Sequence, residues 1–228
     1  MRFILALTLA AFGLSGAALA QDSDPAPFNL FALDGAYANR IFLFDEVYAE
    51  DHDVEVPVPF SVSVPAQDPV EVIADGEPGG NGLAKFTFAV GDPRAFLESV
   101  LIVPTPLPMA ADDAQDPVRA RVETASAVLR DVIFPQVSQG LAGAEMLALE
   151  AYPFEGYMGA HLIARYTDAE LGPMLLRLTA HPNPVGAQSY VAISAINLSM
   201  VPVTNGETLL QSMSTRVANS LTYRASQP

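Results

Sequence analysis

Two neighbouring stretches of the 228-residue chain, YMGAHLIARYT at residues 157–167 and MLLRLTAH at residues 174–181, decide the fold. In both, apolar side chains occupy the even-numbered positions, and successive residues of a strand point to opposite faces of a sheet. This period of two predicts two strands that bury one face in a core. The same pattern places five polar side chains at odd positions, on the opposite face: His161, Arg165, Arg177, Thr179 and His181.

The pattern continues outward from these strands. Residues 144–152 and 189–198 also alternate, and the segments between the four stretches carry proline and glycine, as at Pro153, Gly156, Gly172 and Pro182. Because neighbours joined by short turns pair antiparallel, we expect a four-strand meander. Shorter strands are predicted upstream at residues 60–64, 70–74, 83–90 and 100–103, with a short helical turn from 92 to 99.

Two helices are expected beside this sheet. Asp116 and Pro117 are an N-cap followed by a proline at the first helical position, and an apolar stripe follows over residues 118–132. That stripe consists of Val118, Val122, Ala125, Leu129 and Val132. A capping box at residues 204–207 opens a final helix that extends to about residue 221. The chain is therefore predicted to be α+β: an antiparallel sheet with a C-terminal four-strand meander, covered by a long central helix and a C-terminal helix.

Pro104 begins a loop rich in proline, alanine and aspartate that extends to residue 116. This length is unusual within a compact domain, so the loop is either a flexible excursion or a boundary inside the fold.

The order of these elements resembles that of the PsbP-like and DcrB-like α/β/α sandwich. This family includes extrinsic photosystem II subunits and small exported bacterial proteins. The likeness is one of pattern and spans residues 60–223. It rests on the segments FSVSVP, RAFLESVLIV, VRARVETASAVL, GAHLIARY, MLLRLTA, SYVAISAI and LLQSMSTRVANSL. The resemblance implies a helix-covered antiparallel sheet and a binding or accessory role, and it carries no catalytic residues to this chain.

Residues 1–20, MRFILALTLAAFGLSGAALA, have the three parts of a secretory signal peptide. Arg2 supplies the positive charge, an apolar stretch follows, and Ala18 and Ala20 form the small-x-small cleavage pattern. The alternative is an uncleaved membrane anchor, but the apolar run is shorter than a spanning helix needs. We expect a cleaved, periplasmic protein without a transmembrane segment, comprising an acidic segment at 21–55 and a single α+β domain at 56–228.

Composition excludes several classes of protein. There is no cysteine, which rules out a lipoprotein, disulfides and cysteine-ligated metals. The formal net charge of −15 argues against nucleic acid and anionic lipid as partners, because phosphates would be repelled. The common hydrolase, metalloprotease and nucleotide-binding motifs are absent.

An acidic cluster at residues 46–55 is the densest set of hard-cation ligands in the sequence. It comprises Glu46, Glu50, Asp51, His52, Asp53 and Glu55. Calcium sites of the EF-hand type need a D-x-D-x-D-G spacing that this cluster lacks, so we expect a solvated, self-repelling loop. No metal and no cofactor is predicted.

The polar strand face is the surface site that the sequence suggests. His161, Arg165, Arg177, Thr179 and His181 would form a basic patch that holds an anion or docks an acidic partner. Alternatively, the arginines pair with the protein's own carboxylates or face water. We predict a non-enzymatic binding or accessory factor with a possible envelope partner. A carrier of an apolar ligand and a hydrolase whose site is not visible in the sequence stay open, as does the oligomeric state.

Overall fold

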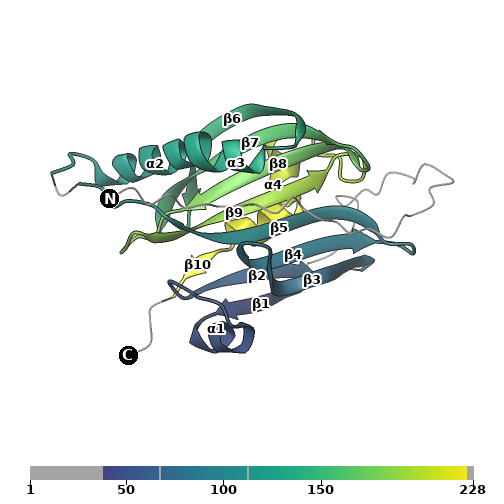
Figure 1. Ribbon diagram of the computed structural model, residues 1–228, viewed down its shortest axis with the longest axis horizontal. Coiled ribbons are helices and arrows are strands. Elements are labelled where there is room, and N and C mark those ends of the chain that lie inside the picture. The colour runs from purple at the N-terminus through teal and green to yellow at the C-terminus, as the bar shows by residue number, and fades with distance from the viewer. Residues whose placement is uncertain (1–37, 67, 112, 225–228) are drawn as a thin grey trace.

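The large sheet has seven antiparallel strands in the order β3-β4-β5-β9-β8-β7-β6, as Figure 1 shows. This computed structural model describes residues 38–66, 68–111 and 113–224; the predicted signal peptide lies outside them. The strands are β3 (Val70–Gly79), β4 (Gly82–Val90), β5 (Ala95–Pro106), β6 (Ala142–Phe154), β7 (Tyr157–Asp168), β8 (Gly172–His181) and β9 (Gln188–Asn197). Strands β6 to β9 form the predicted C-terminal meander, so the α+β class and its sheet are confirmed.

A second, three-stranded sheet lies against the large one, which the sequence did not indicate. It contains β1 (Ala38–Phe44), β2 (Phe60–Ala66) and β10 (Thr222–Tyr223), with β2 in the middle and both neighbours antiparallel to it. The small sheet brings the two ends of the described chain together, because β1 and β10 flank the same strand.

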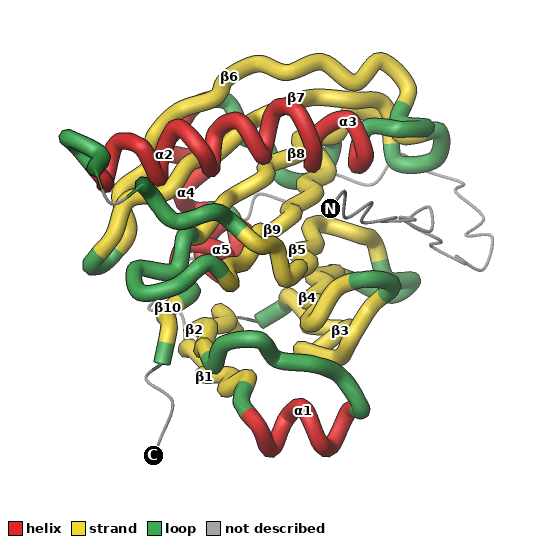
Figure 2. Tube along the Cα trace, turned by 60° about the vertical axis from the view of Figure 1, so that its left-hand side comes forward, coloured by secondary structure: helices red, strands yellow, loops and turns green. Residues whose placement is uncertain are grey.

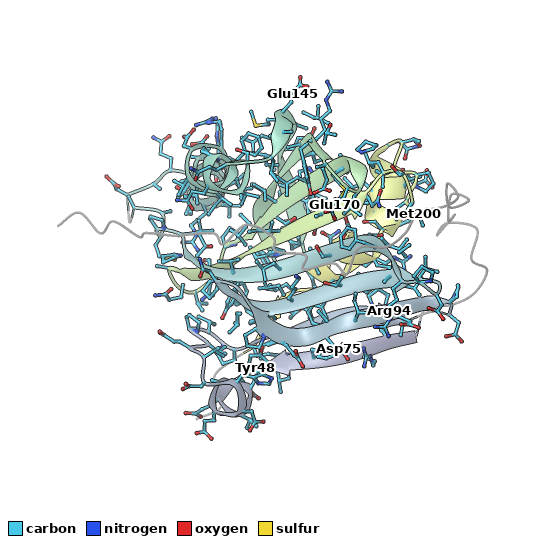
Figure 3. The ribbon with its side chains drawn as sticks, turned by 45° about the vertical axis from the view of Figure 1, so that its right-hand side comes forward. Tyr48, Asp75, Arg94, Glu145, Glu170 and Met200 are labelled. Atoms are coloured by element: carbon cyan, nitrogen blue, oxygen red, sulfur yellow. The ribbon has the colours of Figure 1, made fainter. Side chains whose placement is uncertain are left out.

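Part of the acidic cluster expected in a loop forms helix α1 (Glu46–His52) instead, whereas Asp53 and Glu55 follow the helix in a loop as expected. Asp45 caps the helix by accepting hydrogen bonds from the backbone N–H groups of Val47 and Tyr48. The Tyr48 hydroxyl donates to the carbonyl oxygens of Gly76 and Leu83, and Figure 3 shows this side chain between α1 and the strands. The helix buries none of its own residues, so its acids do face solvent as expected.

One face of the large sheet is covered by the central helix (Figure 2), which is α2 (Pro117–Val128), the π-helical turn η2 (Leu129–Ile133) and α3 (Phe134–Val137). Ala125 and Leu129 are buried as predicted, but Val132 is 46% exposed. The N–H of Phe134 donates to the carbonyl of Leu129, five residues back. This wider turn shifts the buried stripe to Ile133 and Val137, so the prediction for Val132 was wrong.

The opposite face is covered by the small sheet and by α4 (Gly206–Gln211) and α5 (Met213–Asn219). The C-terminal helix is thus two helices, separated at Ser212, whose backbone is extended and whose side chain caps α5. The capping box of α4 pairs Asn205 with Thr208, one residue later than predicted.

The helical turn predicted from residue 92 to 99 was also wrong. Strand β5 already begins at Ala95 and pairs with both β4 and β9. Leu97 and Val100 are buried in the core between the two sheets, and this packing outweighs the local capping signal. None of the helices in the described residues is long and apolar enough to cross a membrane.

Candidate functional site

The five polar residues of the predicted patch lie on β7 and β8, and His161 pairs in register with Thr179. The expectation that this face is open to solvent was wrong for four of them. Arg177, Thr179 and His181 are fully buried, and His161 is nearly so. The reason is that α5, the small sheet and aromatic residues of β6 and β7 cover this side of the large sheet.

Arg165 is the exposed member of the set. Its guanidinium contacts the Glu145 carboxylate of β6 at 2.6 Å, and Figure 3 labels Glu145 at the edge of the sheet. This is the alternative in which an arginine pairs with the protein's own acid. An exposed pair of this kind contributes up to about 1 kcal/mol.

Arg177 is a buried cation held by neutral groups. Its Nη1 donates to Asn219 Oδ1 at 2.9 Å, its Nη2 lies 3.2 Å from His161 Nδ1, and its guanidinium stacks 5.2 Å from the Tyr152 ring centroid. Among the described residues, no carboxylate lies within ion-pair distance of it. Burial lowers the pKa of Arg177 to about 10, so it stays charged at neutral pH.

Both buried histidines are kept neutral by this environment. Burial, with the Arg177 charge, lowers the pKa of His181 to about 3. The same two causes lower the pKa of His161, against the opposing effect of Glu150, whose carboxylate is 3.5 Å from His161 Nε2. The Tyr157 hydroxyl lies 2.9 Å from His181 Nδ1 and also donates to the Leu221 carbonyl.

Helix α5 therefore lies between a buried acidic side chain and a buried arginine. At its first turn the buried Glu98 carboxylate accepts from the N–H groups of Met213 and Ser214 and from the Ser214 hydroxyl. At its last residue, Asn219 accepts from Arg177. A carboxylate at the N-terminus and a cation at the C-terminus both match the helix dipole. The cluster is enclosed, so its evident role is to fix α5 against the sheet.

An open pocket of about 710 Å³ lies at the end of the large sheet where α2 begins, on the left of Figure 1. Its walls come from four segments: the loop that leads into α2, the first turns of α2 itself, the β6–β7 hairpin and the β8–β9 turn. The lining residues are Met109, Ala110, Ala111, Ala114, Pro117, Val118, Arg121, Phe154, Gly156, Tyr157, Met158, Pro182, Asn183 and Pro184.

Arg121 joins two of these walls. Its Nη1 donates to the carbonyl oxygens of Leu107 and Pro108, and its Nη2 donates to those of Asn183 and Gly186. Burial lowers the pKa of Arg121. The guanidinium thus holds the α2 loop and the β8–β9 turn in place, although no sequence pattern singled out Arg121.

Tyr157 connects the pocket with the buried cluster. Its ring lines the pocket, while its hydroxyl contacts His181 and Leu221 behind the wall. Arg121 and Tyr157 are the titratable side chains among the described lining residues, and most of the others are apolar. A largely apolar lining with a few polar groups suits the binding of an apolar molecule.

The described residues contain no group of three or more histidine, aspartate or glutamate side chains placed to hold a metal ion. The acidic side chains of α1 are therefore not gathered into a cation site there. Sequence reasoning missed the pocket because its walls are distant in the chain, although the uncharged loop residues 104–111 and 182–188 were a visible signal.

No family model matches the sequence, and no curated protein matches it significantly. Solved structures with a similar fold include LpqN of Mycobacterium tuberculosis, involved in cell envelope biogenesis, at 12% identity and a TM-score of 0.43, covering 82% of this chain and 92% of that one. Cyanobacterial PsbP from Synechocystis matches at 12% identity and a TM-score of 0.38, covering 85% of this chain and 98% of that one. The Ran-binding protein Mog1p of Saccharomyces cerevisiae matches at 12% identity and a TM-score of 0.34, covering 80% of this chain and 88% of that one.

The comparison thus finds a PsbP protein, the family that the sequence pattern resembles. At this identity and structural overlap, the matches carry no inference about ligand, partner or cellular location.

Proposed function

We propose that this protein is an exported, non-enzymatic binding protein that takes an apolar ligand into the pocket beside α2. The observation that carries the proposal is the lining of that pocket: about 710 Å³ of open space walled by methionine, alanine, proline, valine and aromatic side chains. Binding sites for small molecules fall within about 300–1,000 Å³ and are mostly apolar with a few polar groups.

The predicted patch on β7 and β8 is a weaker candidate for a binding surface than this pocket. A docking surface must be reachable, and Arg177, Thr179 and His181 are fully enclosed. The role of an apolar-ligand carrier, an alternative at the level of sequence, therefore becomes the better supported one. A protein partner in the envelope would act together with such a carrier by delivering or receiving the ligand.

Export is the second part of the proposal and rests on residues 1–20, with Ala18 and Ala20 at the cleavage pattern. Intact mass of protein recovered from the periplasm should correspond to a chain that begins at Gln21. A mature chain that still begins at Met1 would contradict it.

The ligand site can be tested with a fluorescent apolar probe, N-phenyl-1-naphthylamine, added to the purified protein. We expect saturable enhancement of fluorescence, weakened at least tenfold by Ala114→Trp, because the indole would fill space that Ala114 lines. Ala169→Trp is the matched control, since Ala169 is exposed in the β7–β8 turn at the other end of these strands. Equal binding by both variants would refute the assignment of the pocket.

The non-enzymatic part has its own readout. Ligand that co-purifies with the protein should be recovered chemically unchanged by mass spectrometry after prolonged incubation. Conversion of the bound molecule would support a hydrolase instead.

A further inference from the structure

Three exposed apolar side chains surround the mouth of the pocket. Val185 is 89% exposed at the tip of the β8–β9 turn, Val118 is 57% exposed at the start of α2, and Met109 is 48% exposed in the loop before it. Val118 and Met109 also line the pocket, and Asn183 and Pro184 connect Val185 to its wall. Large apolar side chains gathered at one end of a soluble domain indicate a surface that is covered in use.

The segments that carry this rim are uncharged. Residues 104–111 (PTPLPMAA) and 182–188 (PNPVGAQ) contain no acid and no base, in a chain whose formal net charge is −15. The exposed charged groups beside the rim include three acids: Asp113, Asp116 and Glu155. The Arg121 guanidinium in the pocket wall is the one cation among the described lining residues, so the acids outnumber it. Arg119, in the first turn of α2, is neutralised by its ion pair with Glu123. The local field therefore repels anionic lipid headgroups and leaves an electrically neutral surface as the compatible partner.

We propose that this end of the molecule docks onto an electrically neutral bilayer surface, with Val185 inserted among the lipids and the pocket mouth facing them. The inference rests on the proposed function: a carrier of an apolar ligand needs a place to load. An apolar rim that is continuous with an apolar pocket lets the ligand move between lipid and protein without crossing water, because both surfaces are removed from water together.

The geometry favours lipid over a protein partner. The rim is made of three separate apolar side chains, Met109 and Val185 in loops and Val118 in the first turn of α2, rather than a continuous sheet edge or helix face that could pair with a polypeptide. Side chains at the tips of turns can enter the interfacial region singly, because that region does not demand a shape-complementary surface.

The test is flotation of the mature protein with phosphatidylcholine vesicles. We expect wild-type protein to float with these vesicles and Val185→Glu to lose at least fivefold of the bound fraction. Val47→Glu is the matched control: it makes the same substitution at a valine that is 66% exposed on α1, away from the pocket, and should bind like wild type. Addition of phosphatidylglycerol to the vesicles should weaken binding, and more so at low salt.

Several outcomes would overturn the proposal. Wild-type protein that does not float, equal loss in the two valine variants, or binding that requires phosphatidylglycerol would each contradict it. Loss of an envelope protein from pull-downs of Val185→Glu, with no vesicle binding by wild type, would assign the rim to a protein partner instead.

Failure here is distinguishable from failure of the proposed function. Val185 is not among the residues that line the pocket, so Val185→Glu should bind N-phenyl-1-naphthylamine as wild type does. Retained probe binding also shows that this variant is folded. Probe binding without vesicle binding would leave the carrier function standing and remove the bilayer as its loading site.

Discussion

His181 should make the stability of this protein depend on pH between 7 and 5. The side chain is fully buried, and burial together with Arg177 lowers its pKa to about 3. An unfolded histidine titrates near pH 6.5, so the unfolded chain takes up a proton that the folded protein refuses. Because the folded pKa is depressed, stability is fully present above pH 6.5 and is lost as the pH falls.

The magnitude follows from linkage. At pH 5 the unfolded histidine is almost fully protonated and the folded one is neutral. The free energy of unfolding is therefore about 2 kcal/mol lower at pH 5 than at pH 7. The loss should grow to roughly 4 kcal/mol near pH 3, where the folded imidazole also begins to protonate. His161 should add to the loss, since its pKa is lowered as well. The buried Glu98, whose pKa is raised by burial, acts in the opposite direction.

A difference between variants isolates the contribution of His181. Urea unfolding at pH 7, 6 and 5 should give a slope for wild type that exceeds the slope for His181→Asn by about 2 kcal/mol over that range. His52→Asn is the control, because it removes an exposed histidine of α1 and leaves the buried cluster intact.

Absolute stability is not the readout, because His181→Asn also disturbs packing and the contact with Tyr157. Should that variant fail to fold, the imidazole resonances of wild type provide the same answer in a nuclear magnetic resonance titration. Equal slopes for wild type and His181→Asn, or a His181 resonance that titrates with a midpoint near 6.5, would refute the reasoning.

Three substitutions test the packing on either side of the large sheet. Leu129→Asp should lower the free energy of unfolding by about 3–5 kcal/mol, because it places an unpaired charge between the central helix and the sheet. Val132→Asp, at an exposed position, should change it by about 0.5 kcal/mol. Equal urea midpoints for the two variants would mean that the π-helical turn does not move Val132 out of the buried stripe. Gly159→Ala should destabilise by about 1–3 kcal/mol, since its methyl group would overlap the Ala180 carbonyl and lie 2.7 Å from the Phe154 ring. A thermal midpoint like that of wild type would show that β7 and β8 can separate at this point.

The meander could be predicted from sequence because its signal is local. The alternation of apolar and polar residues in β7 and β8 indicates which side chains share a face of the sheet. The short turn between the two strands favours antiparallel pairing, as the structure shows. The cap of α2 at Asp116 was equally visible and holds in the structure. The predicted stripe fails at Val118, in the first turn of α2, and at Val132, in the π-helical turn that the sequence does not indicate.

The candidate site could not be predicted because its signal is not local. Arg177 and His181 looked solvent-facing since they are polar, and strand parity cannot reveal that α5, some forty residues later, covers the same face. The pocket is harder still: Met109, Phe154 and Pro184 belong to three turns that only the folded sheet brings together. The sequence signal near the pocket was the lack of charge in residues 104–111 and 182–188 of an otherwise acidic chain. Such a signal indicates an apolar surface, but it does not predict a cavity.

The buried cluster and the pocket are two parts of one arrangement, joined at Tyr157. A buried arginine without a carboxylate partner is expensive to keep, and here it holds the C-terminal end of α5 while Glu98 holds the N-terminal end. Chain that follows α5 returns through Leu221 and Tyr223, whose carbonyl and hydroxyl contact Tyr157 and the His181 backbone. The wall of the pocket is thus fixed by the polar contacts of the buried cluster. Arg177 and Glu98 shape the site without lining it, and Arg121 is the charged side chain among the described residues of the walls.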